Sequence, residues 1–207
     1  MIGIYGGTFN PVHYGHLRTA LEITQAFQLE QLRMIPCHLP PHRQVPDVSA
    51  ETRLQMLRLA VADTPGLQLD RRELDRAGPS YMVDTLQSLR AEFPQTSLLL
   101  IMGADAFAGL SNWHCWQQLP ELAHIVVMTR PGFSHPALSE FWQARHCTDK
   151  AQLATQAAGY LMFETVSQLE ISATYIRQII AAGGNPQFLL PDAVLAFIKQ
   201  HQLYQTA

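Results

Sequence analysis

Residues 6–16 read GGTFNPVHYGH and directly follow the short apolar segment Ile2–Tyr5. The alternation before the glycines predicts a buried strand, and apolar residues at helical spacing after them predict a helix over 16–28. Glycines let an anion approach the main chain because no Cβ stands in the way. The free N–H groups and the positive dipole end of the following helix favour negative charge. The stretch therefore predicts a phosphate-binding turn between a first strand and a first helix.

Two histidines belong to this turn. His13 and His16 add ring N–H donors, and positive charge when they are protonated. Their spacing would also suit two metal ligands, but no nearby cysteine or acidic cluster completes a metal site, and no metal ligand is predicted. A strand–glycine–helix junction alone occurs in many α/β proteins. Neither GxxxxGKS/T nor GxGxxG is present, which excludes the P-loop and the common dinucleotide fingerprint.

The composition is that of a globular protein with a small net charge. The chain has 207 residues, of which 47% are hydrophobic, and 14 Lys and Arg stand against 17 Asp and Glu, a net charge of −3. This length suits one domain over residues 1–207 with a sizeable core. Nucleic-acid binding is not expected, because it depends on broad positive surface. A small anionic ligand needs only a local positive site, so that class remains open.

The sequence also bears on the compartment. The apolar run at 97–102 is too short to span a bilayer, and the N-terminus lacks the basic region of a signal peptide, so we expect no membrane association. Cys37, Cys115 and Cys147 are odd in number, scattered, and without zinc-site spacing. We therefore expect no disulfide framework and a reducing, cytoplasmic location.

Strand and helix patterns alternate along the chain. Strands are predicted at 31–36, 67–69, 97–102, 124–129 and 159–163, and further helices at 49–62, from 80 onward, at 172–182 and at 189–202. A strand, a helix and a strand within the first 36 residues form a βαβ unit, whose strands pair in parallel. The pattern predicts an α/β fold with a doubly wound parallel sheet flanked by helices. A small C-terminal helical part is expected at about 172–204.

Ligands of open parallel sheets gather at the carboxyl ends of the strands. Arg43, in a proline-rich loop after the second strand, and Arg130, after the strand at 124–129, place basic groups there. Gly103 and Asp105 follow the most apolar run, and a carboxylate at that point commonly accepts hydrogen bonds from ribose hydroxyls. Capping of a short helix is the alternative role for Asp105.

Other residues have simpler interpretations. Arg53 is predicted to be a surface charge, with a position facing a ligand as the alternative. Residues 71–76 are predicted to be a solvated turn, and Thr85 a helix residue with a modest packing role. Trp113 and Trp116 are three residues apart, which is typical of core packing, although a tryptophan at the ligand end of the sheet could stack on an aromatic ring.

The late helix predicts a second anion-binding element. Ser172 and Thr174 stand at its start, where hydroxyls normally cap a helix, and Arg177 follows about one turn later. Hydroxyls, free N–H groups and a guanidinium can converge on phosphate oxygens at such a terminus.

Two motifs carry a resemblance to a known superfamily. Residues 7–16 match GxFxPxHxGH and residues 171–177 match ISxTxIR, which resembles the nucleotidyltransferases. Further matches are PPHR at 40–43, GPSYMVDTL at 78–86, MGADAF at 102–107, NWHCW at 112–116 and TRPG at 129–132. Over nearly the whole chain the sequence is most similar to the bacterial nicotinate mononucleotide adenylyltransferase family.

This resemblance implies a Rossmann-like fold and an enzyme of NAD biosynthesis. The implied reaction joins nicotinate mononucleotide and ATP, which carries Mg²⁺, to give nicotinate adenine dinucleotide and pyrophosphate. The residues implied at the ATP phosphates and adenosine are His13, His16 and Arg177 as catalytic groups, with Gly6, Gly7, Thr8, Phe9, Gly103, Asp105, Ser172 and Thr174. The residues implied at the second substrate are Arg43, Thr85, Trp113 and His114, to which we add Arg130 for its place at a strand end.

Two departures and two rival functions stay open. Asn10 stands where the family often has Asp, and Ala173 where it often has Ser, which leaves the role of residue 10 open and removes one possible phosphate donor. One rival is an adenylyl- or cytidylyltransferase for another phosphorylated acceptor, such as nicotinamide mononucleotide. The other is a non-catalytic module that binds a nucleotide and releases no pyrophosphate.

Overall fold

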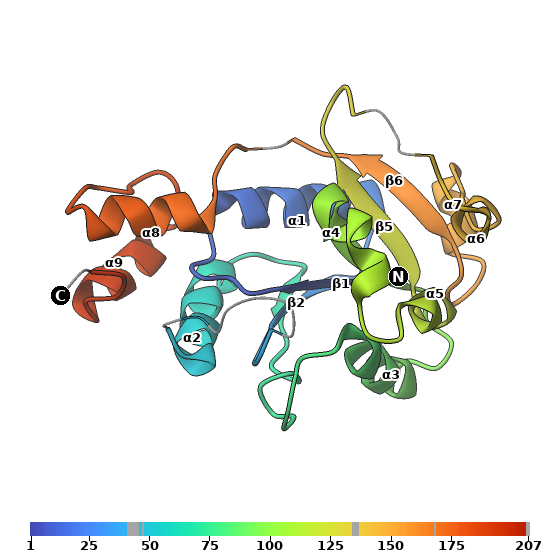
Figure 1. Cartoon of the computed structure of the whole chain (residues 1–207), viewed down its shortest axis with the longest axis horizontal. Helices are drawn as coiled ribbons and strands as arrows, with labels where there is room; N and C mark the ends of the chain where they lie inside the picture. The colour runs from blue at the N-terminus through green and yellow to red at the C-terminus, as the bar shows by residue number, and fades with distance from the viewer. Residues whose placement is uncertain (41–45, 47, 134–136, 168, 206–207) are drawn as a thin grey trace.

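The computed structural model describes residues 1–40, 46, 48–133, 137–167 and 169–205. Within them, six strands form one parallel sheet in the order β3-β2-β1-β4-β5-β6 (Figure 1). The strands are β1 (Ile2–Gly7), β2 (Gln31–Pro36), β3 (Leu67–Leu69), β4 (Leu98–Gly103), β5 (His124–Thr129) and β6 (Leu161–Thr165). The longer helices are α1 (Tyr14–Ala26), α2 (Ala50–Val61), α3 (Met82–Glu92), α8 (Ala173–Ala181) and α9 (Asp192–Gln200). The shorter ones are α4 (Ala104–Ala108), η1 (Leu110–Asn112), η2 (Trp116–Gln118), α5 (Leu119–Leu122), α6 (Glu140–Gln143) and α7 (Lys150–Leu153).

The strand order reverses at β1. This strand pairs with β2 on one side and with β4 on the other. Such a switch point opens a crevice at the carboxyl ends of the two central strands, where ligands of this architecture bind. The fold therefore places the glycine turn after β1, and the start of α4 after β4, at the same edge of the sheet.

The alternation of β4 explains why the sheet is covered on both faces. Leu99 and Ile101 belong to one apolar core, with residues of α1, α2, α8 and α9. Leu98, Leu100 and Met102 belong to the other, with residues of α3 and α5. Because successive side chains of a strand point to opposite faces, a continuous apolar run fills both cores.

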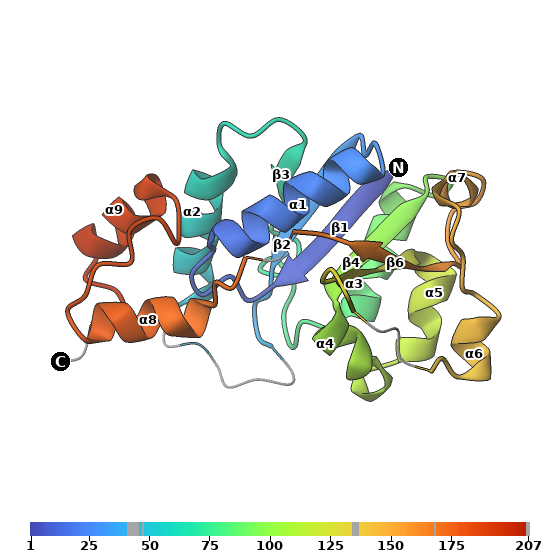
Figure 2. The ribbon, with the colours of Figure 1, turned by 90° about the horizontal axis from the view of Figure 1, so that it is seen from above.

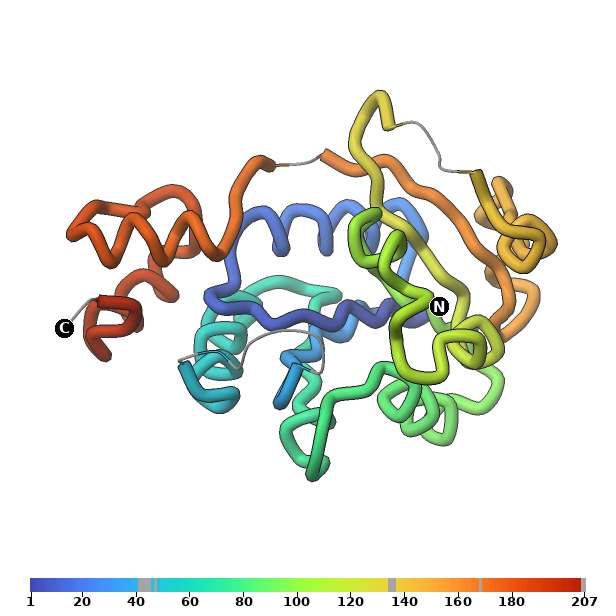
Figure 3. The backbone as a smooth tube through the Cα atoms, in the orientation of Figure 1, coloured from blue at the N-terminus to red at the C-terminus, as the bar shows by residue number. Residues whose placement is uncertain are grey.

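The C-terminal helices extend the molecule beyond the sheet. In Figures 1 and 2, α8 and α9 lie at one end next to α2, and α6 and α7 lie at the other. The tube in Figure 3 shows the chain crossing from β6 to α8 above α1. The main-chain N–H of Tyr14, the first residue of α1, donates to the carbonyl of Leu189, 3.0 Å away. The chain thus returns from its far end to the start of the first helix.

The sequence predicted this architecture with small errors at the boundaries. The α/β class and the doubly wound parallel sheet are confirmed. The helix predicted from residue 16 begins at Tyr14, and the last strand ends at Thr165 rather than at 163. Helices α6 and α7 were not predicted, because four-residue helices carry little periodicity. Within the described residues, no helix is long and apolar enough to cross a membrane.

Two predictions of solvent exposure were wrong. Arg53 is 1% exposed, because its Nη1 and Nη2 atoms donate to main-chain carbonyls that the sequence does not reveal. Glu73, in the predicted solvated turn at 71–76, is 3% exposed, because its carboxylate accepts a hydrogen bond from Thr85 at 2.7 Å. Burial of either charged group depends on partners from other segments of the chain.

Candidate active site

The glycine turn leads from β1 into α1 through a tightly folded loop. Phe9 has a φ of +48° and is 2% exposed. Its ring packs edge-on against Tyr5 and against His16, with centroid distances of 5.9 and 5.1 Å. Phe9 is thus an apolar anchor of the loop.

His13 and His16 stack at the start of α1. Their ring centroids are 3.7 Å apart, and His13 occupies the N-cap position of the helix. The main-chain N–H of His13 donates to Nδ1 of His16 at 3.3 Å. A nitrogen that accepts carries no proton, so the neutral ring of His16 has its proton on Nε2. The ring of His16 can therefore donate a hydrogen bond from Nε2–H.

Burial keeps both imidazoles neutral. It lowers the pKa of His13 to about 4 and that of His16 to about 3, and the nearby His13 lowers the pKa of His16 further. Of the two contributions expected from these rings, the N–H donors are therefore the one available near pH 7 in the ligand-free protein, and the positive charge requires protonation. Nδ1 of His13 is buried and has no hydrogen-bond partner in the described part of the chain. An unsatisfied buried polar atom is costly, and here it lies where the sequence predicts a phosphate.

The late helix meets this loop directly. Arg177, in α8, donates from Nη1 to the carbonyl of Asn10 at 2.8 Å and from Nη2 to Oγ1 of Thr174 at 3.3 Å. Ser172 is the N-cap of α8, and its Oγ accepts from the N–H of Tyr175 at 3.1 Å. Two segments that are 167 positions apart thus share one end of the sheet. The fold brings together the residues that the two motifs named.

The absence of a side chain at Gly15 allows the segment before α8 to lie close to the start of α1. A Cβ built on Gly15 would lie 3.4 Å from the carbonyl oxygen of Ile171 and 3.0 Å from the ring of His13. The backbone that enters α8 therefore passes against the first turn of α1 at the one position without a side chain.

The end of β4 lies at the same edge. Gly103 is the N-cap of α4, and Asp105 lies in the first turn with an exposed side chain. The alternative N-cap role for Asp105 is therefore wrong. Its exposed carboxylate at the carboxyl end of a central strand agrees with the position predicted for a ribose partner.

A second group of residues surrounds the start of α3. Tyr81 is the N-cap of this helix, and its ring lies 4.4 Å from the ring of His114. The hydroxyl of Thr85 is fully buried, donates to Glu73 at 2.7 Å, and receives a hydrogen bond from Arg76 at 3.1 Å. Thr85 therefore has a polar role, not only the modest packing role predicted. Its hydroxyl thus joins α3 to the segment that contains Glu73 and Arg76.

The remaining predicted residues are placed as follows. Trp113 is half-buried and packs against the core beneath α3. The ring of Trp116 lies tilted against Trp142 and edge-on to Phe141, which agrees with core packing. Arg130 is exposed just after β5 and lines a cavity of about 320 Å³ with Pro131, Ser167 and Glu170. Arg43 and the proposed closure of its loop lie outside the described residues.

Comparison with known proteins places this geometry in a family. The cytidylyltransferase-like family model matches residues 4–179. A curated protein of Methylococcus capsulatus, named "Probable nicotinate-nucleotide adenylyltransferase", is 51% identical over 99% of both chains. A protein of the same name from Cellvibrio japonicus is 48% identical over 99% of this chain and 98% of its own.

The chain belongs to the nicotinate-nucleotide adenylyltransferase family.

Solved structures show the same fold at low sequence identity. A nicotinic acid mononucleotide adenylyltransferase from Plasmodium falciparum, complexed with NaAD, superposes with a TM-score of 0.74 at 14% identity and covers 98% of this chain. The same parasite protein complexed with APC gives a TM-score of 0.73. The Rossmann-like arrangement of this adenylyltransferase family member is therefore confirmed.

Sequence reasoning missed the burial of two charged residues next to these groups, Arg53 and Glu73. Arg53 donates to the carbonyls of Thr8 and Cys37, and Glu73 holds Thr85. For Arg53 the available signal was its place in α2 among apolar residues, since Leu54, Met56 and Leu57 are all buried. For Glu73 no sequence pattern indicated burial, because five of the six residues at 71–76 carry charge and such a run is typical of exposed turns.

The hydrogen-bond donors around the glycine turn suit an anion better than a metal ion. Nε2–H of His16, the guanidinium of Arg177 and the hydroxyl of Thr174 are hydrogen-bond donors. Among the residues that the structure describes, no three His, Cys, Asp or Glu side chains are grouped as metal ligands. The arrangement is able to hold a phosphate chain whose own oxygens carry a metal ion, as Mg²⁺ commonly binds in nucleotide sites.

Proposed function

We propose that this protein joins nicotinate mononucleotide to ATP, forming nicotinate adenine dinucleotide and pyrophosphate, a step of NAD biosynthesis. The full-length identity of about half to curated relatives of this name supports the assignment. The single structural observation that carries it is the hydrogen bond from Arg177 to Asn10, which joins the two motif segments at the carboxyl edge of the sheet.

The chemistry needs no protein base. A 5′-phosphate has a second pKa of about 6, so it is largely ionised at neutral pH and attacks as a nucleophile. An oxygen of that phosphate forms a bond to the α-phosphorus of ATP. The bond from this phosphorus to the bridging oxygen breaks, and pyrophosphate leaves with the electron pair. The protein therefore has to align two anions and stabilise the charge that grows on the leaving group.

We assign these tasks to the motif residues. Neutral His13 and His16 donate N–H groups, and Arg177 supplies a permanent charge beside them. Electrostatic donors of this kind are typically worth about 3–4 kcal/mol each in the transition state. Ser172 and Thr174 add the start of α8, whose free N–H groups favour phosphate oxygens. Mg²⁺ would arrive bound to ATP and would neutralise part of the charge on its phosphates.

The second substrate is assigned to the group around α3. Thr85, Trp113 and His114 would receive the nicotinate ring and its carboxylate, and Arg43 and Arg130 would meet its phosphate. The proximity of the Tyr81 and His114 rings to the N-terminus of α3 supports this choice. A helix N-terminus favours the carboxylate of the acid over the uncharged amide. Asp105, with Gly103, would hold the ribose of ATP.

Pyrophosphate release measured in parallel with nicotinate mononucleotide and nicotinamide mononucleotide tests the proposal. We expect turnover with the acid and much slower turnover with the amide. Preference for the amide would make the protein a different adenylyltransferase. ATP binding without pyrophosphate release, with either acceptor, would make it a non-catalytic nucleotide-binding module.

A further inference from the structure

Arg53 is a buried cation that donates to main-chain oxygens and, at 4.0 Å, to Sγ of Cys37. It lies in α2, is 1% exposed, and donates from Nη1 to the carbonyl of Thr8 at 2.7 Å. From Nη2 it donates to the carbonyls of Cys37 at 2.8 Å and His38 at 3.3 Å. None of the ion pairs between described residues includes Arg53. A buried charge costs several kcal/mol in desolvation, so its presence here calls for a reason beyond core packing.

The three carbonyls belong to loops that follow neighbouring strands. Thr8 directly follows β1 and precedes the histidines, whereas Cys37 and His38 directly follow β2. The two strands are paired in parallel from Ile2 to Gly7, so their loops leave the sheet side by side. The guanidinium bridges these loops just below the carboxyl edge.

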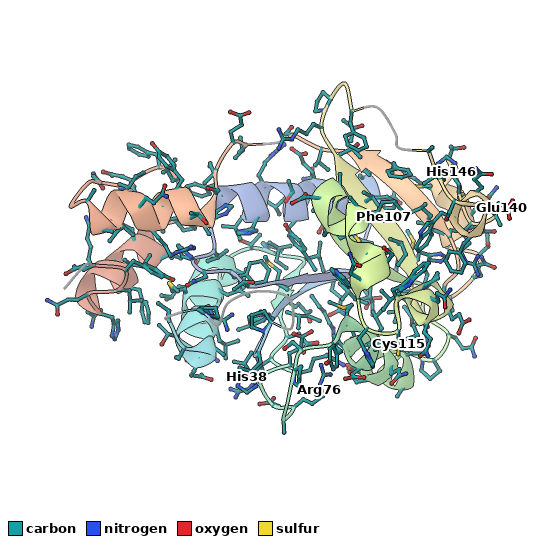
Figure 4. The ribbon with its side chains drawn as sticks, viewed as in Figure 1. His38, Arg76, Phe107, Cys115, Glu140 and His146 are labelled. Atoms are coloured by element: carbon teal, nitrogen blue, oxygen red, sulfur yellow. The ribbon has the colours of Figure 1, made fainter. Side chains whose placement is uncertain are left out.

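The second loop is hydrogen-bonded to the segment that precedes α3. The N–H of His38 donates to Oγ of Ser80 at 2.9 Å, and the N–H of Ser80 donates to the carbonyl of Leu39 at 2.9 Å. Ser80 precedes Tyr81, the N-cap of α3. Arg76, which donates to the carbonyl of Tyr81, lies with His38 along the lower edge of the molecule in Figure 4. A continuous series of hydrogen bonds thus runs from the loop of His13 to the group assigned to the second substrate.

We propose that Arg53 is a positioning residue for adenylyl transfer. It fixes the spacing between the loop that holds the ATP phosphates and the corner that holds the attacking mononucleotide. This inference rests on the proposed function and adds a residue to it. Arg53 acts on main-chain oxygens and touches neither substrate, so its effect is on alignment. Displacement of reacting groups by about 1 Å can cost about 10²-fold in rate.

The guanidinium fork is essential to this role. Its planar set of donors reaches the carbonyls of two loops at once, whereas a lysine ammonium is a compact point charge on a flexible stem. Arg53→Lys therefore keeps the positive charge and loses the bridge. Arg53→Met removes both and keeps an unbranched apolar side chain.

Arg90 provides a matched control at the opposite edge of the sheet. It too donates to main-chain carbonyls, those of Leu122 at 2.6 Å, Thr96 at 2.8 Å and Ala157 at 2.8 Å. Leu122 and Thr96 lie just before β5 and β4, at the amino ends of the strands. Loss of the hydrogen bonds of Arg90 should lower the Tm about as much as loss of those of Arg53, without moving the loops that hold the substrates.

The experiment compares Arg53→Lys and Arg53→Met with Arg90→Lys and Arg90→Met. The kcat and both KM values are measured by pyrophosphate release, at a temperature where circular dichroism shows every variant folded. We expect Arg53→Lys to lower kcat by about 10²-fold with both KM values close to those of the wild type. Arg90→Lys should keep the wild-type kcat despite a similar loss of Tm.

Three results would overturn the proposal. They are a wild-type kcat in Arg53→Lys, a change confined to the KM for ATP, and an equal loss of kcat in Arg90→Lys. If neither Arg53 variant folds while both Arg90 variants do, Arg53 is a folding residue and the proposal fails. A wild-type chain inactive with nicotinate mononucleotide would instead count against the proposed function, and the comparison would then use the acceptor that the wild type does accept.

Discussion

At the scale of single residues, the stacked rings of His13 and His16 have two consequences. They are neutral near pH 7 because burial disfavours their charged forms, and Nε2–H of His16 is fixed as a donor by the main-chain hydrogen bond to Nδ1. A neutral donor stabilises charge that develops in the transition state without first binding a proton. The two rings should therefore affect rate and acid stability in separable ways.

We expect His16→Asn to lower kcat by about 10²–10³-fold, because one donor to the leaving group is lost. The Tm should change little in comparison, and pyrophosphate release with thermal unfolding checks both. His146→Asn is the matched control, since His146 is exposed and lies at the end of the molecule opposite α8 (Figure 4). A loss of Tm that accounts for the whole loss of activity would make His16 a structural residue.

Acid should destabilise the protein through the same rings. The unfolded chain protonates each histidine near pH 6.5, whereas folded His13 does so only near pH 4. The unfolded state therefore binds more protons between these values, and the free energy of unfolding falls as the pH falls.

For His13 alone this linkage amounts to about 2 kcal/mol between pH 7 and pH 5. Urea unfolding of the wild type and His13→Asn at both pH values measures it. The variant should lose about 2 kcal/mol less than the wild type on acidification. Parallel losses in the two proteins would contradict the low pKa of His13.

At the scale of elements, Asn10 joins the C-terminal helices to the first loop. Its carbonyl accepts from Arg177 in α8, and its Oδ1 accepts from the hydroxyl of Tyr204, beyond α9, at 2.7 Å. Burial raises the pKa of Tyr204, so the hydroxyl remains a donor. The neutral side chain of Asn10, which departs from the Asp often found in the family, accepts this hydrogen bond.

We expect Tyr204→Phe to lower the free energy of unfolding by about 1–2 kcal/mol, because Oδ1 of Asn10 is left unpaired. The KM for ATP should rise as the loop loosens. A double-mutant cycle with Asn10→Ala measures the coupling, which we expect at about 0.5–1.5 kcal/mol. Additive effects of the two substitutions would show that the hydrogen bond contributes nothing. Tyr160→Phe, directly before β6 at the amino ends of the strands, is the control.

At the scale of the whole molecule, the strand order brings every predicted ligand-binding segment in the described residues to the carboxyl edge of one sheet. The loops after β1 and β2, the start of α4 and the end of β5 meet there because the strands are parallel. The apolar cores behind this edge hold the sheet rigid. The middle of the strands thus supplies most of the stability, and the loops at their carboxyl ends supply the groups for catalysis.

Leu100→Ala tests this division, since Leu100 is 1% exposed in the centre of β4. We expect a loss of about 2–5 kcal/mol in the free energy of unfolding, from lost burial and a residual cavity. The kcat should stay near the wild-type value at temperatures where the variant is folded. Denaturant unfolding and pyrophosphate release measure the two effects. A large fall in kcat in the folded variant would show that the core also sets the geometry of the site.

Local residue patterns were sufficient to predict the strands, the longer helices and the chemistry at their ends. Glycines after an apolar strand, histidines at the first turn of α1, and the hydroxyl of Ser172 at the start of α8 are local patterns, because capping and backbone freedom depend on near neighbours. Only the tertiary structure decided that Arg177 reaches Asn10, that Arg53 is buried, and that the histidines are neutral. These outcomes depend on desolvation and on main-chain oxygens supplied by distant segments, and no local pattern of residue types records where those oxygens will lie.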